Sequence, residues 1–179
     1  PTFTMQANTN SVPGLDIIIE GSEEFRQQTI RSLELYQQCA PEALAEADIY
    51  LEKIEEYDRS GMDVDTGSFQ ASMATAFADG YELEVQVFWF GGSIIHDARH
   101  RWQYLNGIDT NWSTIDLAGR ESIENDARGV QIAAMEPCLA FVSDENRYHA
   151  EYLLNYLKDM QSGKTPCDYC KVDYDDRDW

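Results

Sequence analysis

Basic residues are scarce in this sequence of 179 residues: 13 lysines and arginines face 33 aspartates and glutamates, a formal net charge of −20. Binding to the phosphates of nucleic acid or to an anionic membrane surface requires a basic surface, so we expect no nucleic acid and no membrane among the partners. A surface this acidic favours basic peptides instead. Long hydrophobic runs are also lacking, and a chain without about 18 consecutive apolar residues has no candidate for a membrane-spanning helix.

Cysteine is rare too, with four residues that allow three full pairings. An even count favours disulfides, and so an oxidising compartment and a secreted protein. Cys167 and Cys170 form a C-x-x-C pair that lacks the second pair of a structural zinc site. The pair also does not open a helix in a βαβ pattern, as a redox motif would. We therefore expect these two cysteines to be used in disulfides, and the pairing stays open, with a crossing to Cys39 and Cys138 among the alternatives.

The apolar pattern predicts one α+β domain over residues 1–163, with a loose arm at 1–14 and an acidic, cysteine-containing tail at 164–179. We expect a small mixed sheet of about four strands packed on helices. Asp79-Gly80 is typical of a hairpin turn between two strands. Strands are predicted over 15–20, 49–54, 69–78 and 81–90, and helices over 22–39, 41–47, 93–106, 120–134 and 143–162.

Histidine is rarer still, with three residues in the chain. His96 and His100 lie four apart in a segment that reads as a helix capped by Ser93, so both imidazoles lie on one helical face. Two imidazoles at this spacing can bind a single metal ion. Asp97, beside the first histidine, has a carboxylate that could reach a metal-bound water.

A strand, a helix with His-x-x-x-His and a later helix with Glu-x-x-Ala resemble the zincin metallopeptidases, and within them the small gluzincins. The resemblance implies a zincin-like fold and a bound Zn²⁺, with His96, His100 and Glu124 as its ligands. It also implies that the strand expected at 81–90 is the edge strand that binds substrate.

Two further acidic side chains compete with Glu124 for the third ligand position. Glu121 lies one helical turn before Glu124, and Asp126 lies on the same predicted helix. The spacing does not separate Glu121 from Glu124.

The family motif is His-Glu-x-x-His, and this sequence has Asp97 in place of the glutamate. The resemblance assigns that residue the general base, which takes a proton from the zinc-bound water. We therefore expect a zinc-dependent metalloendopeptidase. The alternatives are a catalytically impaired, zinc-binding pseudo-protease that acts as a binding or interaction module, and an acidic secreted structural domain without a metal. Gluzincins also use a later Tyr or His as the oxyanion donor, which favours Tyr148 and then His149. A monomer acting on a peptide or protein substrate is expected.

Overall fold

The computed structural model describes residues 11–173 and 176, and within them it has four short strands and six α-helices. The strands are β1 (Ile18–Glu20), β2 (Lys53–Glu56), β3 (Gly61–Asp63) and β4 (Ser68–Ala71). The helices are α1 (Glu23–Cys39), α2 (Pro41–Tyr50), α3 (Met73–Phe77), α4 (Leu83–Leu105), α5 (Leu117–Cys138) and α6 (Asp144–Gln161). Two 3-10 turns follow α5 and α6: η1 (Leu139–Phe141) and η2 (Asp168–Lys171). The expected α+β class and the four-stranded mixed sheet are confirmed.

The sheet has the strand order β1-β2-β4-β3, so β3 lies at one edge. β1, β2 and β4 are parallel, and β3 is antiparallel to β4. α1 and α2 make the crossover from β1 to β2 that a parallel pair requires. Ile19, Ile54 and Phe69 are fully buried from three neighbouring strands, and they anchor one face of the sheet in the core.

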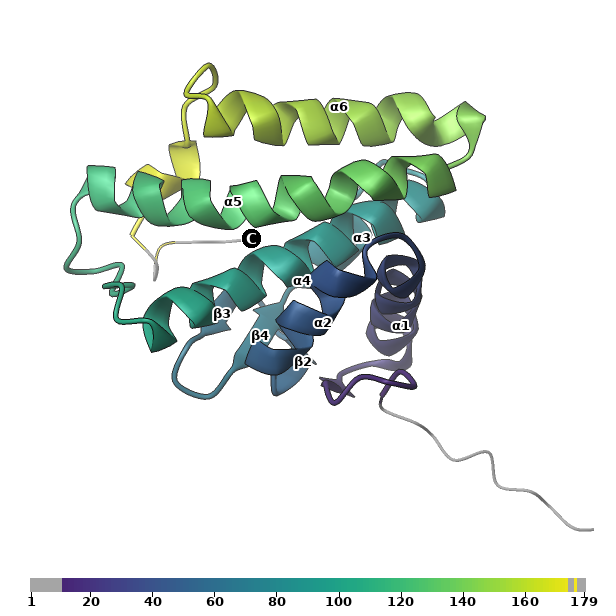
Figure 1. Cartoon of the computed structure of the whole chain (residues 1–179), viewed down its shortest axis with the longest axis horizontal. Coiled ribbons are helices and arrows are strands. Elements are labelled where there is room, and N and C mark those ends of the chain that lie inside the picture. Colours follow the sequence, from purple (N-terminus) through teal and green to yellow (C-terminus); the bar gives the residue numbers. More distant parts are fainter. Residues whose placement is uncertain (1–10, 174–175, 177–179) are drawn as a thin grey trace, which may run out of the picture.

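Helix α4 lies at the centre of the molecule and contacts each of the other five α-helices as well as β3 and β4. Figure 1 shows α5 and α6 on one side of α4, with the sheet, α1 and α2 on the other. The phenyl ring of Phe90 packs against Phe25 and Phe69, with ring centroids 6.0 and 6.2 Å away. Gly91 allows α1 to pack closely on α4, because a Cβ there would lie 2.2 Å from the Tyr36 ring.

The predicted hairpin over residues 69–90 is wrong. Ser68–Ala71 is a strand, but the rest of the first run forms α3, and the second run is the first half of α4. Asp79-Gly80 is a turn, with Gly80 at φ +92°, but it connects two helices. The alternating apolar residues misled the prediction because apolar residues lie on exposed as well as buried positions of this part of α4: Leu83 is 47% exposed, and Trp89 is only partly buried. The sequence therefore shows no clear polar stripe at helical spacing.

Helix ends were predicted better than the hairpin. The side chain of Ser22 caps α1 by accepting a hydrogen bond from Phe25 N, and α4 ends at Asn106 as expected. Ser93 is not an N-cap, however: it is buried inside α4, and its hydroxyl donates to the carbonyl of Trp89 at 3.2 Å. A serine inside a helix can satisfy its hydroxyl on the preceding turn, which sequence alone does not distinguish from a cap.

The cysteines pair as Cys39–Cys138 and Cys167–Cys170. Disulfide use is therefore confirmed, and of the pairings left open the structure has the one without a crossing between the tail and the other two cysteines. Cys39–Cys138 joins the end of α1 to the end of α5 across 99 residues of sequence, whereas Cys167–Cys170 closes the η2 turn. Two disulfides are consistent with an oxidising environment. Among the described residues, no helix is both long and apolar enough to cross a membrane.

Candidate metal centre

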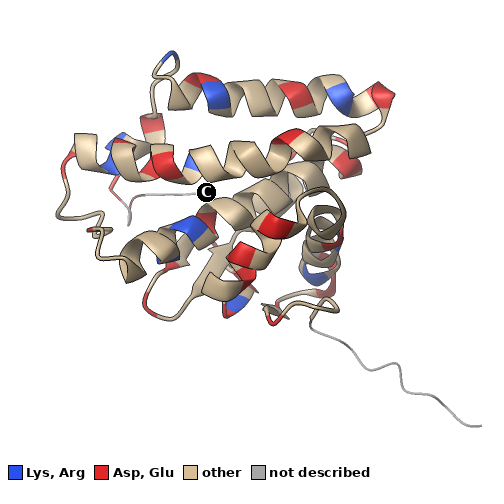
Figure 2. Ribbon diagram, viewed as in Figure 1, with Lys and Arg blue, Asp and Glu red and all other residues tan. Residues whose placement is uncertain are grey.

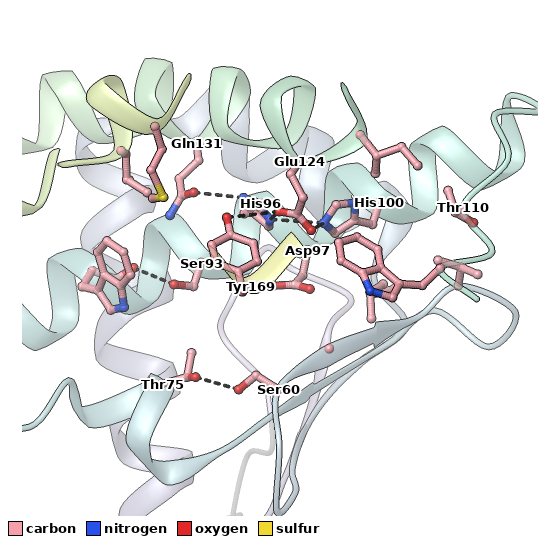
Figure 3. Close-up of a pocket in the computed structure, with 18 of the residues that line it drawn as sticks. Ser60, Thr75, Ser93, His96, Asp97, His100, Thr110, Glu124, Gln131 and Tyr169 are labelled. Carbon is pink, nitrogen blue, oxygen red and sulfur yellow. Dashed lines mark hydrogen bonds and ion pairs between the residues drawn. The ribbon is translucent and has the colours of Figure 1, made fainter. Parts of the chain in front are cut away.

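Three potential metal ligands meet between α4 and α5. His96 and His100 lie one turn apart on α4, and Glu124 lies on α5, which packs against it. Their ligand atoms all lie within 4.8 Å of one another. Figure 3 shows the two imidazoles and the carboxylate pointing toward one another. The chain therefore has a buried His-His-Glu cluster that could hold a metal ion.

The distances within this cluster suit a small tetrahedral cation. His96 Nε2 lies 3.1 Å from His100 Nε2 and 3.1 Å from Glu124 Oε2, and His100 Nε2 lies 3.5 Å from Glu124 Oε1. Bonds of 2.0–2.1 Å at tetrahedral angles place donor atoms about 3.3–3.4 Å apart. The three separations bracket that value, so one ion could bind all three side chains with small adjustments.

Two glutamines orient the imidazoles from behind. His96 Nδ1 lies 3.0 Å from Gln131 Oε1, and His100 Nδ1 lies 2.9 Å from Gln103 Oε1. The Gln103 amide nitrogen donates to Ile123 O at 3.0 Å and to a carboxylate at 2.8 Å, so its oxygen is left to accept. His100 therefore donates from Nδ1, which leaves Nε2 as the atom that can bind a metal.

The electrostatics of the cluster favour an ionised carboxylate. Burial by itself would raise the pKa of the Glu124 carboxyl, but His100 and then His96 hold that pKa well below its usual range. Burial by itself would lower the pKa of the His100 imidazole, yet the Glu124 carboxylate beside it raises that pKa to about 9. Glu124 is thus charged, as a ligand must be, and a cation binding here would displace a proton from His100.

The cluster opens onto a cavity of about 360 Å³. Asp97 lines this cavity together with His96, His100 and Glu124. The opposite wall includes residues 60–62 and Val64, which belong to β3 and its flanks. Several large apolar side chains complete the lining: Trp89, Trp112, Ile123, Leu157 and Met160. A water molecule or a substrate group could therefore reach the three ligand atoms and the Asp97 carboxylate from the same space.

The structure separates the rival third ligands. Glu124 is 4% exposed and belongs to the cluster, whereas Glu121 is not part of it. Asp126 instead forms an ion pair with Arg99 at 2.8 Å and accepts a hydrogen bond from Gln103 at 2.8 Å. Its carboxylate therefore orients the glutamine behind His100.

The expected oxyanion donors are not brought to the cavity. Tyr148 is 72% exposed on α6 and is not among the described residues that line the cavity. His149 packs its ring against Tyr81 and Tyr148, with centroids 5.7 and 5.6 Å away. Tyr169 does line the cavity, and its hydroxyl lies 3.4 Å from Glu124 Oε2. Burial and the Glu124 carboxylate raise the pKa of Tyr169, so the hydroxyl remains protonated.

The edge strand expected at 81–90 is also corrected, because these residues lie mostly in α4. The edge strand beside the cavity is β3, which is hydrogen-bonded to β4 on one side and ends the sheet on the other. Residues 58–67 read as a loop in the sequence, since a three-residue strand leaves almost no periodic signal.

Sequence reasoning also missed Gln103, Gln131 and Tyr169. The glutamines carried a weak signal: Gln103 lies three residues after His100, and Gln131 lies seven after Glu124, so each shares a helical face with a ligand. Tyr169 carried none, because only the folded tail brings it to the cavity.

Comparisons with protein-family models, with curated proteins and with solved structures found no match to this chain. The resemblance to zincins therefore rests on the motif and on the buried cluster.

Proposed function

We propose that this protein is a zinc-dependent endopeptidase. One observation carries the proposal: His96, His100 and Glu124 converge on one point, and Asp97 lines the cavity that this point faces. A metal centre and a nearby carboxylate are the two components that metal-assisted hydrolysis requires.

Zinc fits the donor set better than calcium or magnesium does. Two imidazole nitrogens and one carboxylate oxygen form the three-ligand set of catalytic zinc sites, which leave a fourth position for water. Calcium and magnesium prefer sites built from oxygen atoms alone. A bound zinc ion would polarise a carbonyl group and acidify a water molecule.

Asp97 then serves as the general base. It follows His96 in α4, so the same helix that holds the ligands also holds the base. The carboxylate takes a proton from the attacking water and returns it to the leaving amine. Gln103 and Gln131 keep both imidazoles oriented throughout.

Edge strand β3 offers a place for the substrate backbone. Its outer edge has no partner strand in the described sheet, and residues 60–62 line the cavity. An extended peptide could add to this edge as a further strand, with a peptide bond placed over the metal centre.

The lining of the cavity does not favour a carboxypeptidase. Binding of a terminal carboxylate calls for a cationic side chain, and no lysine or arginine is among the described residues that line the cavity. The chain has 33 acidic and 13 basic residues, and Figure 2 shows the acidic positions spread over the helices. The negative electrostatic potential of such a chain would attract extracellular peptides that carry basic residues beside the cleaved bond.

A second function is favoured by one specific feature. Aspartate is one methylene shorter than the glutamate of the family motif, a difference of about 1.5 Å in reach. If this gap stops proton transfer, the protein would bind zinc and peptides without cleaving them.

Two substitutions at one position distinguish the functions. We expect the purified chain to cleave quenched fluorescent peptides, to lose this activity to a chelator and to regain it with zinc. D97N should lower kcat/KM by about 10²–10⁴-fold with unchanged zinc content, because a general base contributes that much. An inactive wild type that binds zinc, together with an active D97E variant, would favour the binding module. A chain that neither binds zinc nor cleaves peptides would refute both.

A further inference from the structure

The C-terminal segment returns to the metal centre as a short turn closed by a disulfide. Cys167 and Cys170 are bonded to each other and buried, and Tyr169 lies between them in η2. The Tyr169 hydroxyl lies 3.4 Å from Glu124 Oε2, the oxygen that is also 3.1 Å from His96 Nε2. The turn therefore places the Tyr169 hydroxyl beside the Glu124 carboxylate, the group that would bind the metal (Figure 3).

Arg128 on α5 connects this turn to the helix by hydrogen bonds. Its side chain is 1% exposed, and it lies four residues after Glu124 on the same helical face. The guanidinium donates from Nε to the Tyr169 hydroxyl at 3.0 Å and from Nη2 to Cys167 Sγ at 3.0 Å. Because the tyrosine oxygen accepts from Arg128, its hydrogen can be donated to Glu124.

Further contacts hold the rest of the turn. The Trp112 indole donates to Val172 O at 2.9 Å, and Arg120 donates to Cys170 O at 3.3 Å. Arg120 also pairs with Asp173 at 3.1 Å. The turn is therefore fixed to the start of α5 as well as to its middle, and Tyr169 has little freedom to move away from Glu124.

We infer that Tyr169 is a positioning residue for Glu124, and that the Cys167–Cys170 disulfide makes cation affinity depend on its redox state. This rests on the proposed metal function. A dithiol reductant would cleave the bond by exchange, becoming a disulfide itself while both cysteines become thiols. Without the cross-link the turn gains conformational freedom, and Tyr169 leaves the carboxylate for part of the time. The other disulfide, Cys39–Cys138, joins the end of α1 to the end of α5 and does not close the turn that carries Tyr169.

Zinc affinity, measured on the full chain by competition with a chromophoric chelator, tests the role of Tyr169. We expect Y169F to weaken zinc binding by about 10–100-fold, the usual effect of removing a partner of a metal ligand. Y152F is the matched control, because Tyr152 is 57% exposed on α6, and it should bind zinc as tightly as the wild type. Equal affinity of Y169F and the wild type would overturn the inference, whatever the hydrolytic activity.

The disulfide is tested by paired serine variants. C167S/C170S should weaken zinc binding about as much as Y169F does. A variant that combines all three substitutions should bind zinc only slightly more weakly, because both changes act through the same contact between Tyr169 and Glu124. C39S/C138S should lower thermal stability while its folded form keeps wild-type affinity. Additive losses in the triple variant, or an unchanged C167S/C170S, would contradict the redox dependence. A wild type that binds no zinc would refute the metal function itself, and this inference with it.

Discussion

The two halves of α4 differ sharply in what surrounds them. Nine of the 13 residues from 83 to 95 are buried, against two of the ten from 96 to 105. The first half is apolar and contains Phe90, which packs against aromatic rings from α1 and β4. The second half holds both histidines and Gln103, which orients His100. One helix thus carries the core at one end and the metal centre at the other, so folding and cation binding should respond to different substitutions.

The largest effect should come from the first half. F90A removes a fully buried phenyl ring, and such a change lowers the free energy of unfolding by about 3–5 kcal/mol. Denaturant titration measures the loss, and L105A is the control because Leu105 is 57% exposed in the other half. Equal losses in the two variants would remove the distinction between the halves.

The next effect belongs to the second half. H96A should weaken zinc binding by more than about 100-fold, because removing a metal ligand costs more affinity than removing a hydrogen-bond partner of a ligand. In chelator, its free energy of unfolding should fall less than that of F90A. H149A is the matched control, because His149 is exposed and lies outside the cluster. Equal zinc affinities of H96A and H149A would break the comparison.

Zinc binding should also depend on pH with a defined sign. The pKa of His100 is raised to about 9, so below that pH a cation must displace its proton. Apparent zinc affinity should therefore rise about tenfold per pH unit from pH 6.5 to 8.5, with one proton released per ion. In the metal-free protein the raised pKa of His100 has the opposite effect, because protonated His100 stabilises the folded chain through its ion pair with Glu124. This stabilisation is complete below about pH 6.5 and is lost as the pH rises through 9. Chelator competition and calorimetry in two buffers measure both, and a flat profile would contradict the His100–Glu124 pairing.

The smallest effect should come from the glutamines that contact the Nδ1 atoms of the two histidines. Q131M keeps the length of the side chain but removes the acceptor for His96 Nδ1, which should weaken zinc binding about tenfold. The exposed Gln38 provides a control variant, Q38M. If Q131M and Q38M bind zinc equally well, the glutamine does not orient the imidazole.

The same division explains how much could be predicted from the sequence. His96 and His100 could be paired because local spacing on a helix reports which side chains share a face. Glu124 came only from the resemblance to the gluzincins, since spacing does not separate it from Glu121. The first half of α4 could not be predicted, because exposed as well as buried positions there carry apolar residues, so no polar face stands out and the alternation from Leu83 to Trp89 favours a strand. Tyr169 could not be found either, since its place at Glu124 depends on contacts between segments 45 residues apart.

The most direct test of the metal centre is anomalous scattering at the zinc edge from crystals of the protein grown with zinc. We predict one strong peak about 2.0–2.1 Å from His96 Nε2, His100 Nε2 and a Glu124 carboxylate oxygen. Zinc-containing crystals with no peak between these three side chains would contradict the account.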